Sequence, residues 1–179
     1  MPIVSKQRVL IVDDNPANRL AFEVVLEKDF DVRLAESGLQ AIELAQREEF
    51  AVILLDVRMP DMDGFETATR LRRLEGTKHT SIIFTSAVEQ SQAHVYRGFS
   101  VGATDYLFSP VEPEVLKFKV SVYAEFYARD EALRAQIAQL NDVVSALRAS
   151  ARPADTRIRR LEGVIAEMKL QIQEPAGVS

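Results

Sequence analysis

Short apolar runs alternate with amphipathic stretches over roughly the first 125 residues of the chain. The runs Arg8–Val12, Ala51–Leu55 and Ser81–Phe84 are rich in Val, Ile and Leu, a composition typical of strands that are buried on both faces. Alternation of such strands with helical patterns predicts an α/β fold, a doubly wound parallel sheet with helices on both faces. The expected helices cover roughly residues 16–28, 38–48, 64–74, 89–100 and 112 onward.

Three short motifs mark where the first helices begin. Asn15-Pro16 fits a helix start, because proline in the first turn lacks an N–H that the helix does not use. Ser37-Gly38 and Asp63-Gly64 are typical of the turns that enter the second and third helices.

The last third of the chain has a different pattern. After about Ala128 no strand pattern remains, and apolar residues recur at helical spacings of three and four. β-branched residues at heptad position a with Leu-type residues at d are typical of parallel two-stranded coiled coils. Arg157 at g and Glu162 at the following e carry opposite charges, as an interchain pair would. The a positions are Ile137, Val144, Ile158, Ile165 and Ile172, and the d positions are Leu133, Leu140, Leu147, Leu161 and Met168.

Pro153 interrupts this heptad pattern. Inside a helix, proline removes one hydrogen bond and clashes with the preceding turn, which costs about 3 kcal/mol. Two helices, roughly 112–150 and 154–172, could therefore fold back as a hairpin and build a helical bundle. Yet the heptad phase is the same before and after Pro153. Two unrelated helices would share one phase only about one time in seven. The phase favours a kinked or locally opened continuous coiled coil, with the hairpin as the competing interpretation.

Composition narrows the class of protein. The chain has 179 residues, 47% of them hydrophobic and 27% charged, as in a soluble globular protein. The net charge of -5 argues against a nucleic-acid surface, and without cysteine the chain cannot form disulfides or zinc–thiolate sites. No apolar run reaches transmembrane length, and the amino terminus lacks the apolar segment of a signal peptide. We therefore expect a cytoplasmic protein that binds neither membrane nor nucleic acid.

Carboxylates follow two of the predicted buried strands. Asp13 and Asp14 come directly after the first strand, and Asp56 ends the apolar run that begins at Ala51. The carboxyl ends of parallel strands meet at one edge of the sheet, where open α/β folds place their ligands. Three converging carboxylates repel one another unless a hard cation lies among them, and oxygen ligands suit Mg²⁺ or Mn²⁺.

With these motifs the chain resembles the receiver domain of bacterial two-component response regulators, of which the chemotaxis regulator is the simplest. Five motifs match in order and spacing between about residues 6 and 125. The resemblance implies a five-stranded, flavodoxin-like sheet of order 2-1-3-4-5. The motifs are Asp13-Asp14, Asp56 with Met59-Pro60, Asp63-Gly64, Thr85-Ser86-Ala87, and Gly102–Pro110.

The resemblance also implies roles for individual residues. Asp56 would accept a phosphoryl group, and Thr85 and Tyr106 would be the switch threonine and the switch aromatic. The metal would be held directly by Asp14 and Asp56, mostly through water by Asp13, and by the backbone carbonyl of Arg58. Ser109-Pro110 occupies the place of a peptide bond that is cis in the family.

Ser109 departs from the family pattern, which has a lysine at this position. A nearby, partly screened positive charge is worth a few kcal/mol to a phosphoryl group, and serine cannot supply it. The substitution puts phosphorylation-driven switching in doubt but leaves metal binding intact.

We therefore expect a receiver domain over residues 1–125, a coiled-coil signalling helix over 126–173 and a frayed tail over 174–179. The expected function is phosphoryl acceptance on Asp56 with Mg²⁺ from a histidine kinase or phosphotransfer protein, with the signal passed along a dimeric coil. The alternative is a phosphorylation-independent dimeric adaptor. A downstream or fused output domain could receive the signal. A haloacid-dehalogenase-type phosphatase is disfavoured because Arg58 stands where that class has a second Asp. We expect a phosphoacceptor signalling domain that at most phosphorylates and dephosphorylates itself, and not an enzyme.

Overall fold

The computed structural model describes residues 6–86 and 92–173 of the chain. The chain divides into two compact units, Met1–Glu131 and Ala132–Ser179, and each is considered by itself. The predicted tail over residues 174–179 and Ala87 lie outside the described residues, as does the expected start of the fourth helix at residue 89.

The first unit contains a five-stranded sheet in which every neighbouring pair of strands is parallel. The strand order is β2-β1-β3-β4-β5, so the predicted fold class and the order implied by the resemblance are both confirmed. The strands are β1 (Arg8–Val12), β2 (Asp31–Ala35), β3 (Val52–Asp56), β4 (Ser81–Ser86) and β5 (Asp105–Phe108).

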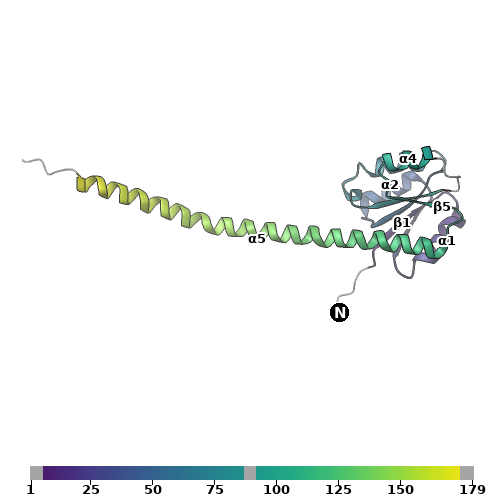
Figure 1. Cartoon of the computed structure of the whole chain (residues 1–179), viewed down its shortest axis with the longest axis horizontal. Helices are drawn as coiled ribbons and strands as arrows, with labels where there is room; N and C mark the ends of the chain where they lie inside the picture. Colours follow the sequence, from purple (N-terminus) through teal and green to yellow (C-terminus); the bar gives the residue numbers. More distant parts are fainter. Residues whose placement is uncertain (1–5, 87–91, 174–179) are drawn as a thin grey trace, which may run out of the picture. The chain divides into compact units, whose positions relative to one another are not determined.

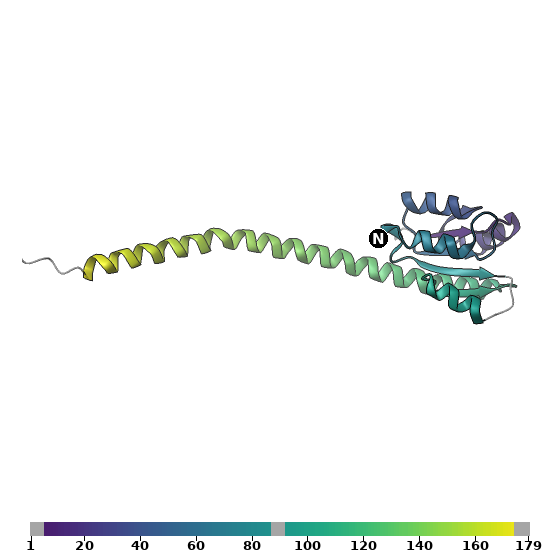
Figure 2. The same cartoon turned by 90° about the horizontal axis from the view of Figure 1, so that it is seen from above.

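Helices cover both faces of this sheet (Figures 1 and 2). One hydrophobic core joins the sheet to α2, α3 and α4, and a second core joins the opposite face to α1 and the first turns of α5. The helices are α1 (Pro16–Leu26), α2 (Gly38–Arg47), α3 (Gly64–Leu71), the short η1 (Glu75–Thr77), α4 (Gln92–Ser100) and α5 (Pro113–Gln173).

Side-chain caps fix where three of these helices begin. The side chains of Asn15, Ser37 and Asp63 accept hydrogen bonds from backbone N–H groups at the starts of α1, α2 and α3. These bonds satisfy donors that have no partner within the helix. All three starts agree with the sequence prediction, including Pro16 in the first turn of α1.

The register of β1 with β3 positions the functional edge. Val12 pairs with Leu55, so the residues that follow, Asp13 and Asp56, emerge side by side where the two strands end. The apolar residues of both strands are at most 1% exposed, which fixes the register through packing on both faces of the sheet.

The carboxyl-terminal part of the first unit is held by polar contacts as well as by packing. The Tyr127 hydroxyl donates to the Glu49 carboxylate at 3.2 Å. His79 Nδ1 lies 2.9 Å from an Asp130 carboxylate oxygen. These two contacts attach α5 to the sheet unit up to the last residues before Glu131.

The second unit is the remainder of α5, which is one uninterrupted helix to Gln173. The helix passes through Pro153 without a break, so the two helices of the hairpin interpretation are not formed, and coiled-coil pairing stays a prediction. The described heptad residues expose their apolar side chains, from 42% for Val144 to 64% for Leu140. No described helix combines the length and the apolar character needed to cross a bilayer.

Candidate functional site

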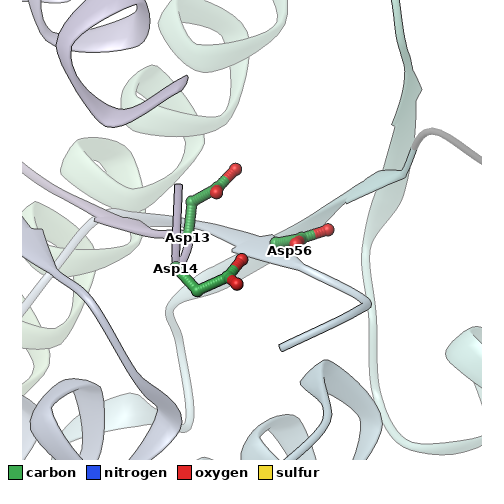
Figure 3. A group of neighbouring side chains, drawn as sticks. All are labelled: Asp13, Asp14 and Asp56. Carbon is green, nitrogen blue, oxygen red and sulfur yellow. The ribbon is translucent and has the colours of Figure 1, made fainter. Parts of the chain in front are cut away.

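Three carboxylates meet at the carboxyl ends of β1 and β3 (Figure 3). Asp13, Asp14 and Asp56 each have a carboxylate oxygen within 4.8 Å of the others. Asp13 is buried, Asp56 is half-buried and Asp14 is exposed. The structure therefore brings together the three acidic residues that the sequence predicted to converge.

Asp13 is fixed in place by the first turn of α1. Its two carboxylate oxygens accept hydrogen bonds from the Asn15 backbone N–H at 2.8 Å and the Asn18 side chain at 3.0 Å. Arg19 donates to the Asp13 backbone carbonyl at 2.6 Å. Burial raises the pKa of Asp13, and the two hydrogen bonds oppose this increase. Sequence reasoning missed Asn18 and Arg19, although their place one turn into the helix after Asp14 is a usable signal.

The surroundings of Asp56 strongly oppose its ionisation. Burial raises its pKa from the ordinary 3.8 to about 6, and the charges of Asp13 and Asp14 add to this effect. Hydrogen bonds from the backbone N–H groups of Arg58 and Val57 act in the opposite direction. A carboxylate in this setting is stabilised by any cation that enters the cluster.

The loop after Asp56 packs tightly against the start of α3. A Cβ on Gly64 would lie 2.2 Å from the Asp56 carbonyl oxygen and 2.9 Å from the Val57 Cα. The Gly64 N–H donates to the Val57 carbonyl at 3.0 Å. Glycine is thus required here by the close approach of the backbone, at the turn into the third helix that Asp63-Gly64 predicted.

The carboxylates line a cleft of about 470 Å³. Thr85 and Ser86 at the end of β4 are buried, whereas Arg58 and Ser109 are exposed. The Ser109–Pro110 peptide bond is cis, as the resemblance implies, and the Ser109 N–H donates to the Ser86 carbonyl at 2.9 Å. The cleft is lined by Asp13, Asp14, Asn15, Asn18, Ala21, Phe22, Asp56, Arg58, Thr85, Ser86, Ser109, Pro110 and Val111.

Among these lining residues, Arg58 alone has a basic side chain. Ser109 places a hydroxyl where the family has an ammonium group, so the cleft contains three carboxylates and one arginine. The donors that could face a cation are all oxygens, the set that Mg²⁺ and Mn²⁺ prefer. The residues present therefore fit a hard divalent ion.

Tyr106 does not line the cleft. The residue is 8% exposed, and its ring lies among Phe84, Phe99 and Phe108. Burial raises the pKa of the Tyr106 phenol, and a backbone hydrogen bond with Gly98 opposes the increase. Of the predicted site residues, Tyr106 is thus the one that the structure places apart from the others.

Comparison with known proteins agrees with this geometry. The sequence profile of the response regulator receiver domain matches residues 9–121. The transcriptional regulatory protein SrrA of Staphylococcus aureus is 38% identical over 113 residues, which are 63% of this chain and 45% of that protein. The chain therefore spans less than half the length of this curated relative.

Two solved structures show the same fold. The chemotaxis protein CheY4 of Vibrio cholerae has a TM-score of 0.64 and 33% identity, covering 66% of this chain and 99% of that one. The receiver domain of the sensor histidine kinase PA1611 from Pseudomonas aeruginosa, with a magnesium ion coordinated in its active site cleft, has a TM-score of 0.62 and 29% identity. It covers 68% of this chain and 99% of that one. Because the profile matches more than half of its residues, this chain belongs to the response regulator receiver family of two-component signalling.

Proposed function

We propose that this receiver accepts a phosphoryl group on Asp56 with the help of Mg²⁺ or Mn²⁺, in the cytoplasm, and passes the signal to a dimeric coiled coil. The donor would be a histidine kinase or a phosphotransfer protein. The observation that carries the proposal is the place of Asp56, half-buried at the end of β3 and within 4.8 Å of two further carboxylates. A downstream or fused output domain would read the coil.

The transfer itself is a simple displacement. An Asp56 carboxylate oxygen forms a bond to phosphorus, and the bond from phosphorus to the donor atom breaks, with its electron pair staying on the donor. The Thr85 hydroxyl would donate to a phosphoryl oxygen, and Asp14, Asp56 and the Arg58 carbonyl would hold the metal, with Asp13 acting through water. A bound divalent ion supplies charge stabilisation for the phosphoryl oxygens.

Ser109 favours a second candidate function. Without the family lysine, the modified Asp56 would lack its strongest cationic partner, so the conformational response would weaken. In the extreme, the protein is a phosphorylation-independent dimeric adaptor. Arg58, which lines the cleft, is the side chain that could supply part of the missing charge.

The coil would join two copies in parallel. Each chain has about ten apolar a and d residues, and burying one fully is worth about 1.5–3 kcal/mol before ordering costs. This sum exceeds the roughly 3 kcal/mol that Pro153 costs. The exposure of the described heptad side chains is the observation that supports pairing.

Phosphorylation of Asp56 is tested with acetyl phosphate and Mg²⁺. We expect one phosphoryl group per chain by mass spectrometry, none after chelation of the metal, and none in Asp56→Asn. Ser109→Lys should lengthen the lifetime of the modified state, because it restores the missing cation. If Asp56 stays unmodified in both the wild type and Ser109→Lys, the phosphoacceptor proposal is wrong and the adaptor is favoured.

Metal binding should depend on Asp14. Asp14→Ala should abolish Mg²⁺ binding measured by calorimetry, because it removes the most accessible carboxylate of the cluster. Glu43→Ala, at an exposed position of α2, is the matched control and should bind as the wild type does. Wild-type affinity in Asp14→Ala would remove the basis for this metal site.

The raised pKa of Asp56 predicts a pH-dependent stability without metal. The folded state binds the proton more tightly than the unfolded state, so stability falls as the pH rises from about 4 to above 6. Asp56→Asn should therefore raise the free energy of unfolding at pH 7 by up to about 3 kcal/mol, and by almost nothing at pH 4. Urea unfolding at both pH values measures this difference. An equal effect at both values would mean that the charge of Asp56 is not the cause.

Replacing Leu140 and Leu161 by Asp should give monomers, or dimers weakened by roughly a hundredfold or more. The matched control is Gln139→Asp, which adds a charge next to the predicted seam but outside it. Light scattering and sedimentation give the assembly state. A double variant that dimerises as tightly as the wild type would exclude the coil as the dimer interface.

Spin labels at Glu167 should lie close together in a parallel pair and far apart in an antiparallel one.

A further inference from the structure

The neighbouring carboxylates Asp13 and Asp14 differ in how firmly their surroundings hold them. Asp13 is 3% exposed, and its backbone N–H donates to the Ala35 carbonyl at 3.2 Å. Arg19 donates to its backbone carbonyl, and both of its carboxylate oxygens accept hydrogen bonds. Asp14 is exposed, and none of the described residues donates a hydrogen bond to its side chain. The cluster therefore combines one carboxylate that is fixed at four points with one that no described hydrogen bond fixes.

One of the two bonds to the Asp13 carboxylate comes from a side chain. Asn18 Nδ2 donates to Asp13 Oδ2 at 3.0 Å, while Asp13 Oδ1 accepts from the Asn15 backbone N–H at 2.8 Å. Any residue except proline could supply the backbone bond, whereas the side-chain bond depends on the amide of Asn18. Asn18 also lines the acidic cleft.

The start of α1 brings Asn18 to this place. The Asn15 side chain accepts a hydrogen bond from the Ala17 N–H at 2.9 Å, and Pro16 follows in the first turn. Asn15 thus caps the helix with its side chain and binds Asp13 with its backbone N–H, which ties the helix start to the carboxylate. Asn18, in the same turn, then meets the carboxylate that lies five positions before it.

The two bonds leave Asp13 able to accept more. Each carboxylate oxygen can accept more than one hydrogen bond, so both oxygens of Asp13 keep capacity for a further partner. Because both oxygens are already bound from α1, this capacity is presented in one orientation. A carboxylate oxygen of Asp13 lies within 4.8 Å of those of Asp14 and Asp56 (Figure 3). Groups that orient the ligands of a metal site in this way typically change its affinity by roughly ten- to a hundredfold when they are removed.

We propose that Asn18 is a positioning residue for the divalent ion, which holds the Asp13 carboxylate in the orientation that binds the ion and does not touch the ion itself. This inference rests on the proposed metal binding at the cluster. Because Asp13 would act mostly through water, the effect of removing Asn18 should be about tenfold, at the lower end of that range.

Calorimetric titration of the full chain with Mg²⁺ tests the positioning role. Asn18→Leu removes the donor and keeps the approximate size of the side chain, and it should weaken Mg²⁺ binding about tenfold at both pH 7 and pH 8.5. Gln46→Leu is the matched control, because it replaces an amide by leucine at an exposed position of α2, and it should bind as the wild type does. Wild-type affinity in Asn18→Leu would overturn the proposal. A loss that disappears at pH 8.5 would also overturn it, because Asn18 would then act on the protonation of Asp13 and not on its orientation.

A double-mutant cycle without metal tests the contact itself. Asn18→Leu should lower the urea midpoint of the wild type, because the buried Asp13 carboxylate loses a hydrogen bond. In an Asp13→Ala background the same substitution should raise the midpoint, because only the gain in helix propensity remains. An equal shift in both backgrounds would show that Asn18 does not hold Asp13, and would overturn the proposal. If the wild type binds no Mg²⁺, the proposed metal site fails, while this cycle still decides whether Asn18 holds Asp13.

Discussion

The parallel pairing of β1 with β3 is the constraint on which the functional edge depends. Both strands are apolar and buried up to Val12 and Leu55, and each fully buried side chain of this size contributes about 1.5–3 kcal/mol. Together they outweigh the roughly 3 kcal/mol that an ionised Asp56 costs without a cation. The core therefore forces the carboxylates together, and the divalent ion that we propose would relieve both the burial and the mutual repulsion of their charges.

Much of this arrangement can be predicted from the sequence, because it arises from local patterns. Buried strands read as apolar runs, helices begin at Asn15, Ser37 and Asp63, and carboxylates that follow two central strands must share an edge. Edge strand β2 gave no such signal. Four of its five residues are only half-buried, and the strand combines apolar with charged residues. It therefore lacks an apolar run, and only the strand order of the family implied it.

Contacts between individual side chains account for the rest of what the sequence did not show. Tyr106 and Gly98 are eight positions apart, and nothing in either segment reveals that the phenol fills the space beside the glycine. Asn18 and Arg19 lie one turn into the helix that follows Asp14, and the structure shows that they contact Asp13 from there. In α5, Pro153 predicted a break in the helix and the shared heptad phase predicted continuity. The helix is continuous to Gln173.

The central claim is that Asp56 holds its negative charge only with difficulty until a divalent ion joins the cluster. Calorimetric titration of Mg²⁺ at pH 6, in buffers that differ in ionisation enthalpy, counts the protons released on binding. With a pKa of about 6, Asp56 should release about half a proton per bound ion, and Asp56→Asn should release almost none. A binding enthalpy that is the same in all buffers for the wild type would show that Asp56 is already ionised without metal, and would contradict the account.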